Sequence, residues 1–296
     1  MSGTFPEGLA LLPYLQEIDF RYSEFDGPLP AELAKWNSLT DVALMHCAFT
    51  GTIPDLWFES RAWVFINLKG NQITGTLSNG ITKLEDMKDL ILSNNKMNGI
   101  LTTEIGNMGN LKNLDLHSNE FRGSIPTTVG KLSHLQAIDL SRNSFTGTIP
   151  EEIGGCTELV DLFMIENLLT GPLPQTFWDF KNLSYIGLGG NKLSGPINNG
   201  LSKFSSLREF GIENNKFNGS FPFRLGNTDI RTIRAYGNAF NGSVSTELCR
   251  LVSNGQLIDL EFDCASPLDG GAPEIYCPDD CCTVCCNSNG ENCVEL

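Results

Sequence analysis

The sequence has little positive charge and no long apolar run. Lysine and arginine number 20 against 35 acidic residues, which gives a net charge of −15 at pH 7 and a pI near 4.6. Because a protein needs a positive face to bind a phosphate backbone, this balance argues against nucleic acid as a partner. No stretch approaches the roughly 20 apolar residues that cross a bilayer. The first residues also lack the basic and apolar regions of a secretory signal.

Catalytic signatures are missing as well. The three histidines, His46, His117 and His134, are scattered, and the chain contains no HExxH, GxSxG or kinase motif. His46 adjoins Cys47, but the repeat described next points Cys47 inward and His46 outward, so the two do not form a catalytic pair. We therefore expect a protein that is not an enzyme and has no cofactor, and we assign it no metal site.

A repeat dominates the sequence. Asparagine, or a small residue in its place, recurs every 24 residues from position 23 to position 215, and once more 23 residues later. Apolar residues precede each of these positions, as Leu111, Leu114 and Leu116 precede Asn119, and a glycine follows four residues later. The alternation predicts a short strand with one buried face, and the glycine predicts a turn. The asparagine side chain can form hydrogen bonds with backbone groups of neighbouring coils. A single coil cannot bury its apolar face, so the coils are stable only when stacked.

The unit LxxLxLxxNxFxGxIPxxIGxLxx resembles the plant-type leucine-rich repeat of receptor-kinase ectodomains and polygalacturonase-inhibiting proteins, over about residues 3–265. The resemblance implies an α/β solenoid, a right-handed superhelix of about 10–11 repeats of 24 residues with a parallel β-sheet on the concave side. We expect residues 1–265 to form the solenoid and residues 266–296 a cysteine-rich C-terminal cap. The first residues match the second half of a repeat, so we also expect that the chain starts in mid-repeat, without the cysteine-bearing N-terminal cap of plant members.

Most of the cysteines follow the last repeat. Cys282 and Cys285 have the C-x2-C spacing of a zinc site, but no histidine is nearby and the adjacent cysteine pairs would crowd a tetrahedral ion, which favours disulfides over metal. The pairing of the tail cysteines stays open. The resemblance further implies a Cys249–Cys264 disulfide that seals the last coil, and the CCTVCC segment is similar to the ends of diatom leucine-rich repeat proteins. The cysteines assigned to disulfides are Cys249, Cys264, Cys277, Cys281, Cys282, Cys285, Cys286 and Cys293.

The remaining cysteines and the sequons bear on the compartment. Cys47 and Cys156 lie about 4.5 coils apart, too far for a disulfide, so we expect both to be buried thiols. Oxidised tail cysteines are typical of secreted proteins or the ectodomains of membrane-anchored proteins. Glycosylation sequons at Asn182, Asn218 and Asn241 agree with an extracellular location.

The outward-facing residues of the strands predict where a partner binds. Acidic residues outnumber basic ones there, which is consistent either with a solubilising role or with a basic peptide, protein or divalent cation bound on the face. Phe163, Ile165 and Tyr185 form an apolar island, unless neighbouring side chains cover them. We expect the contact centre within residues 161–187. The predicted partner-binding residues are Asp139, Asp161, Phe163, Ile165, Tyr185 and Glu209, with Phe65 and Ile91 as a second, smaller island.

Three functions remain open from the sequence. The resemblance implies the extracellular recognition module of a receptor-like protein, which binds a peptide, protein or glycan, with a co-receptor as a further partner. The main alternative is a secreted inhibitor of a foreign hydrolase, similar to the polygalacturonase inhibitors. Ice binding is a remote third, since threonines flank the motif glycine at 50–52, 74–76 and 146–148, in a column that Ile100, Pro172 and Pro196 interrupt.

Overall fold

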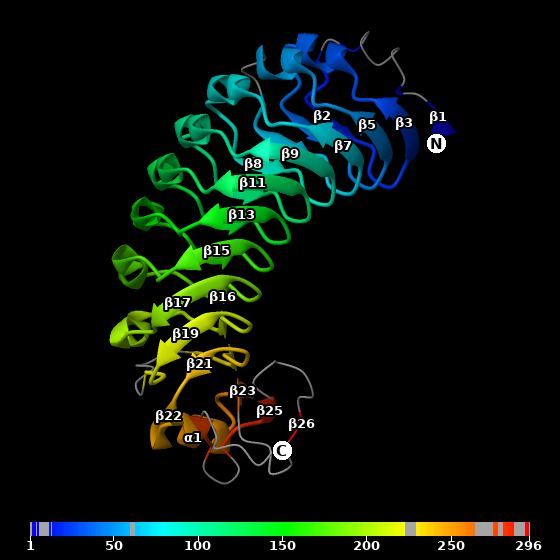
Figure 1. The fold of residues 1–296 in the computed structure, drawn as a ribbon. Coiled ribbons are helices and arrows are strands. Elements are labelled where there is room, and N and C mark those ends of the chain that lie inside the picture. Colours follow the sequence, from blue (N-terminus) through cyan, green and yellow to red (C-terminus); the bar gives the residue numbers. More distant parts are fainter. Residues whose placement is uncertain are drawn as a thin grey trace. The chain divides into compact units, whose positions relative to one another are not determined.

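The computed structural model describes residues 2–3, 5, 12, 14–59, 63–222, 229–263, 275–277, 281–286 and 294–295. The chain divides into two compact units, Met1–Phe145 and Thr146–Leu296, and each is described by itself. Both are stacks of similar coils, and each coil has a short strand, a tight turn, a second strand and, in most coils, a 3₁₀ turn (Figure 1). This is the α/β leucine-rich repeat solenoid that the sequence predicted.

The first strand of each coil belongs to a parallel sheet that we call the primary sheet. In the first unit its strands follow one another in the order β2 Glu17–Asp19, β4 Asp41–Ala43, β6 Phe65–Asn67, β8 Asp89–Ile91, β10 Asn113–Asp115 and β12 Ala137–Asp139. In the second unit the parallel strands follow in the order β14 Asp161–Phe163, β16 Tyr185–Gly187, β18 Glu209–Gly211, β20 Thr232–Arg234, β23 Asp259–Asp263 and β25 Val284–Cys286. Strand β26, Val294–Glu295, pairs antiparallel with β25. The middle residue of each repeat strand from β2 to β20 is buried, as the period of two requires.

The second strands form the secondary sheet. In the first unit they are β1 Ser2–Gly3, β3 Glu24–Pro28, β5 Ala48–Gly51, β7 Gln72–Gly75, β9 Lys96–Ile100 and β11 Glu120–Ser124. Strand β13, Ser144–Gly147, lies at the junction of the units. In the second unit follow β15 Leu168–Gly171, β17 Lys192–Pro196, β19 Lys216–Gly219 and β21 Ala239–Phe240, with a separate pair, β22 Gly242–Ser243 and β24 Ile275–Tyr276.

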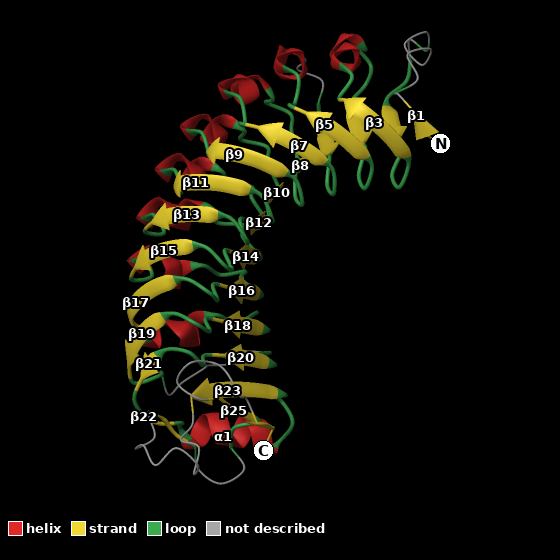
Figure 2. Ribbon diagram, turned by 45° about the vertical axis from the view of Figure 1, so that its right-hand side comes forward, coloured by secondary structure: helices red, strands yellow, loops and turns green. Residues whose placement is uncertain are grey.

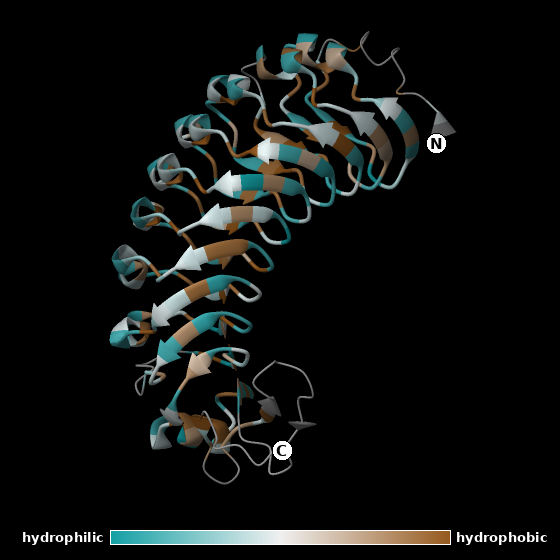
Figure 3. Cartoon of the chain, viewed as in Figure 1, coloured by the Kyte–Doolittle hydropathy of each residue, from teal (hydrophilic) through white to brown (hydrophobic). Residues whose placement is uncertain are grey.

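Short 3₁₀ turns close the coils on the side away from the primary sheet (Figure 2). In the first unit these are η2 Ala31–Lys35, η3 Asp55–Glu59, η4 Asn79–Lys83, η5 Thr103–Asn107 and η6 Thr127–Lys131, and in the second η7 Glu151–Gly155, η8 Gln175–Asp179 and η9 Asn199–Lys203. The helix α1, Thr246–Ser253, replaces the 3₁₀ turn near the end of the second unit. Each coil alternates between hydrophobic and hydrophilic stretches (Figure 3), and its leucines, isoleucines and phenylalanines fill the interior. Among the described residues we find no helix with the length and apolar character of a membrane span.

The repeated asparagines form the predicted hydrogen-bonded ladder. Asn71 Oδ1 accepts a hydrogen bond from the backbone N–H of Phe49 at 3.0 Å, and its Nδ2 donates to the carbonyls of Leu44 at 2.7 Å and Leu68 at 2.9 Å. One side chain thus satisfies buried backbone groups of its own coil and of the preceding one. The same pattern recurs at Asn95, Asn119 and Asn143 in the first unit and at Asn191, Asn215 and Asn238 in the second.

The two cysteines inside the repeats keep their thiols, as predicted. Cys47 takes the place of a ladder asparagine, is half-buried, and donates to the carbonyl of Phe20 at 3.2 Å. Cys156 is fully buried, and this burial raises the pKa of its thiol to about 12.

The end of the second unit corrects one prediction. Cys249 on α1 is bonded to Cys281, with the two Cα atoms 4.7 Å apart, so the expected Cys249–Cys264 pairing is wrong. The reason is an additional layer: β25 pairs in parallel with β23 and brings the preceding segment against α1. A second disulfide joins Cys277 to Cys282. The predicted disulfide positions Cys264 and Cys293 lie outside the described residues, as do the side chains of Cys285 and Cys286.

Candidate ligand-binding face

The predicted apolar island lies on the primary sheet of the second unit, where a glycine leaves space. Phe163 on β14 pairs in register with Gly187 on β16. A Cβ placed on Gly187 would lie 2.8 Å from Phe163 Cδ1 and 2.9 Å from Ile165 Cδ1, so both side chains lie over the bare backbone of that glycine. They remain half-buried and reachable from solvent. The structure therefore brings Phe163 and Ile165 together.

Tyr185 and the acidic residues predicted beside it form the neighbouring row. Tyr185 lies between Asp161 and Glu209 in the register of strands β14, β16 and β18. One carboxylate oxygen of Asp161, Oδ1, is buried without a hydrogen-bond partner, and desolvation raises the pKa of this carboxyl group. Glu209 accepts a hydrogen bond from Arg234 at 2.6 Å. Apolar and acidic groups thus alternate across adjacent strands.

A second carboxylate covers the next glycines of the same sheet. A Cβ on Gly189 would lie 2.3 Å from Glu213 Oε1, and one on Gly211 would lie 3.1 Å from Glu213 Oε2. Glu213 Oε2 is buried without a hydrogen-bond partner, and desolvation raises the pKa of this side chain. A buried acceptor without a donor costs free energy, which a donor from a bound molecule would recover.

Arg234 is the basic centre of this acidic region. Besides Glu209 it approaches Glu261, with Nε and Oε1 4.0 Å apart. Burial, together with the nearby charge of Asp259, raises the pKa of Glu261 to about 7. Sequence reasoning placed these residues outward, but it did not show that a single arginine is shared between two carboxylates.

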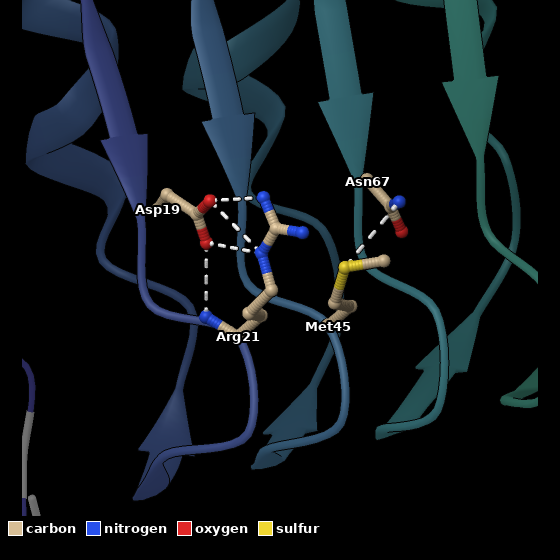
Figure 4. Close-up of polar contacts among 4 residues, drawn as sticks. All are labelled: Asp19, Arg21, Met45 and Asn67. Atoms are coloured by element: carbon tan, nitrogen blue, oxygen red, sulfur yellow. Dashed lines mark hydrogen bonds and ion pairs between the residues drawn. The ribbon is translucent and has the colours of Figure 1, made fainter.

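The primary sheet of the first unit has a cavity of about 270 Å³. Its wall combines exposed or half-exposed side chains of β2, β4, β6 and the turns after them with the buried residues Ile18, Ala43 and Asn67. The lining residues are Glu17, Ile18, Asp19, Arg21, Asp41, Ala43, Met45, Phe65 and Asn67. Figure 4 shows the Arg21 guanidinium against the Asp19 carboxylate and the Asn67 amide directed at the Met45 sulfur, 3.7 Å from it. The Arg21 hydrogen bonds hold the pKa of Asp19 below its usual value. Of these residues the sequence analysis named only Phe65 as a contact residue, and it did not indicate a cavity beside it.

The second predicted island is not a single row. Phe65 is opposite Asp89, and Ile91 is opposite Asn67, so Phe65 and Ile91 lie in different rows. Only Phe65 lines the cavity. Asp139, the remaining predicted contact residue, lies on β12 opposite Asp115.

The predicted glycosylation sites are accessible. Asn182, Asn218 and Asn241 are all exposed, and Asn218 and Asn241 follow β-strand residues of successive coils in the secondary sheet. The residue after each motif glycine covers the glycine of the next coil, as Thr52 does for Gly75 and Thr76 for Gly99. Ile100, Pro172 and Pro196 take this place elsewhere, so the threonine column is interrupted as the sequence indicated.

Comparison with known proteins agrees with this geometry. The family model described as leucine rich repeat matches residues 109–169 and 133–193. A crystal structure of a TDR receptor is 30% identical, with a TM-score of 0.83, over 90% of this chain and 47% of the receptor chain. The chain is a leucine-rich repeat protein.

Other solved structures match this leucine-rich repeat protein along most of its length. The Arabidopsis receptor kinase HAESA, in complex with the peptide hormone IDA and the co-receptor SERK1, is 27% identical with a TM-score of 0.81, over 93% of this chain and 46% of the HAESA chain. A plant ice-binding protein, 22% identical with a TM-score of 0.61 over 92% of this chain and 80% of its own, shares the fold. The chain spans about half the length of the two receptor chains. No curated protein matches it.

Proposed function

We propose that this leucine-rich repeat protein is a non-catalytic, extracellular recognition module of a receptor-like protein, and that it binds a peptide or protein on the primary sheet. The observation that carries the proposal is the apolar surface of Phe163 and Ile165 over Gly187, beside Tyr185. Exposed aromatic and aliphatic side chains on a rigid sheet are typical anchors of recognition. The similarity to HAESA, whose structure holds a peptide hormone and a co-receptor, supports this function.

The charge of the same surface indicates the chemistry of the partner. Asp161 and Glu213 each keep a buried oxygen without a donor, and Glu209 shares Arg234 with other carboxylates. A basic residue, or a backbone N–H of an extended peptide, would supply the missing hydrogen bonds. We therefore propose a partner that combines an apolar anchor with positive charge.

The disulfides and the sequons support an extracellular location and glycosylation of this protein. The Cys249–Cys281 and Cys277–Cys282 disulfides are typical of an oxidising compartment. Exposed Asn182, Asn218 and Asn241 are open to glycosylation there. Both observations support secretion, or attachment to a membrane through a segment outside this chain.

A double substitution tests the proposed contact centre. Peptides selected from a random display library on the wild-type protein should be rich in basic and aromatic residues. The double substitution Phe163→Ala with Tyr185→Ala should lower the affinity for these peptides at least 10-fold, about 1.4 kcal/mol. Ile100→Ala, which removes a 63% exposed apolar side chain from the secondary sheet, is the matched control and should leave affinity unchanged. Both variants should melt close to the wild type. Equal affinity of the double variant and the wild type would remove the site assignment. In a separate pull-down from secreted proteins, capture of a glycosidase would favour a hydrolase inhibitor.

A further inference from the structure

Three possible metal ligands converge on the primary sheet of the first unit, and one of them, Asp139, is also a predicted partner-binding residue. Asp115 on β10 is directly opposite Asp139 on β12, and His117 follows two residues after Asp115. One donor atom from each of the three side chains lies within 4.8 Å of the other two. Two donors bound to one Zn²⁺ at about 2.0–2.1 Å are roughly 3.3 Å apart at a tetrahedral angle, so small side-chain rotations bring the three donors to one ion.

Both carboxylates are held in place by neighbouring groups. Asp115 Oδ1 accepts a hydrogen bond from the backbone N–H of His117 at 3.1 Å, and its Oδ2 accepts one from the fully buried hydroxyl of Ser93 at 2.6 Å. Asp139 Oδ1 accepts one from the backbone N–H of Ser141 at 2.9 Å. Partners of this kind orient the ligands of metal sites and strengthen binding.

The register makes a cation favourable at this point. Like charges directly opposite one another on adjacent strands are destabilising, and Asp115 and Asp139 are both only half-exposed. The imidazole of His117 lies beside them and offers a nitrogen donor rather than a further negative charge. The cluster is therefore more than an acidic patch, since it combines oxygen and nitrogen donors around one point.

We propose that Asp115, His117 and Asp139 form a binding site for a divalent transition-metal cation, and that this cation is Zn²⁺. Imidazole and carboxylate together suit Zn²⁺, whereas Ca²⁺ and Mg²⁺ prefer six or more oxygen ligands. Three protein ligands leave a fourth position of the ion open. Water, or a carboxylate of a protein partner, would occupy that position. The bound cation would therefore allow this otherwise acidic sheet to bind an acidic group of a partner.

Zinc titration of the intact, oxidised chain tests the site. The protein is dialysed against a chelator, its thiols are alkylated so that Cys47 and the tail cannot bind metal, and ZnCl₂ is added in a calorimeter. We expect one equivalent of Zn²⁺ to bind with micromolar affinity. His117→Ala and Asp139→Asn should each weaken binding at least 10-fold, and Ser93→Ala should weaken it by about 10-fold through loss of orientation.

Controls separate this site from unspecific binding and from unfolding. His134→Ala removes an exposed histidine outside the cluster and should bind zinc like the wild type. Fluorescence of the buried Trp57 and Trp63 reports whether each variant keeps the fold of the first unit. A shift of the His117 ring proton signals on addition of Zn²⁺ would confirm direct coordination. Unchanged zinc affinity in folded His117→Ala would overturn the proposal. So would the absence of binding at about 100 µM Zn²⁺, a concentration that detects even weak sites.

Discussion

Replacing one ladder asparagine should destabilise the first unit by an amount that its hydrogen bonds predict. Asn71→Ala removes three hydrogen bonds, and the N–H of Phe49 and the carbonyl of Leu44 are left in the interior without this partner. Each orphaned buried group costs about 1–3 kcal/mol, so we expect the two groups together to cost roughly 2–6 kcal/mol. Equilibrium urea unfolding, followed by the fluorescence of buried Trp57 and Trp63, measures this loss.

The reciprocal substitution should act in the opposite direction. Cys47 occupies the same ladder position but donates only through its thiol, to the carbonyls of Phe20 and Met45. Cys47→Asn restores an amide that can also accept a hydrogen bond from the backbone, so we expect a gain of about 0.5–1.5 kcal/mol. Asn110→Ala is the control, because this exposed asparagine makes a single hydrogen bond to a carbonyl and should cost under about 0.5 kcal/mol. If Asn71→Ala were no more costly than Asn110→Ala, the ladder would not be the source of stability argued above.

Three further predictions concern packing, the cap and pH. Gly106→Ala should cost about 1–3 kcal/mol in thermal or urea unfolding, because its Cβ would lie 2.3 Å from a backbone oxygen of the next coil, whereas Gly109→Ala, with open space, should be neutral or slightly stabilising. Cys249→Ser with Cys281→Ser should destabilise the second unit by about 4 kcal/mol, since the disulfide closes a loop with a sequence separation of 32; an unchanged melting temperature would contradict this. The pKa of Glu261 is raised from 4.5 to about 7, so its favourable contribution is complete below pH 4.5 and is lost as the pH rises through 7. Relative to Glu261→Gln, wild-type stability should fall across that window, and parallel pH profiles would exclude this effect.

The repeat made most of the fold predictable, because its pattern is set by local chemistry. An apolar residue on either side of a polar one gives the strand, and the asparagine 24 residues on repeats the same hydrogen bonds, as Asn71 and Asn95 do. The cap was less predictable, since no repeat pattern indicates that β25 pairs beside β23 as a further strand of the primary sheet. The resemblance therefore implied Cys249–Cys264, whereas Cys249 is bonded to Cys281, three residues before β25.

The candidate site was predictable only in part, because it depends on a glycine at a strand position where a side chain would otherwise cover the sheet. The pattern placed Phe163 and Ile165 outward, but their convergence follows from Gly187, which has no side chain to separate them. In the first unit Ala43 and Phe65 line a cavity that the sequence pattern did not indicate. A repeat consensus describes what each position usually holds, and the binding surface arises where a coil departs from it.

The acidic residues of the primary sheet show how this protein balances charge locally within each unit. Arg21 binds Asp19 in the first unit, and Arg234 binds Glu209 and approaches Glu261 in the second. At the opposed pair of β10 and β12 the neighbouring group is His117, whose imidazole can bind a metal in its neutral form. The proposed divalent ion would offset both carboxylates there, whereas in the second unit Arg234 brings one positive charge to Glu209 and Glu261. Under this proposal, an arginine offsets neighbouring carboxylates in the second unit, and a cation held with the help of His117 would do so at β10 and β12.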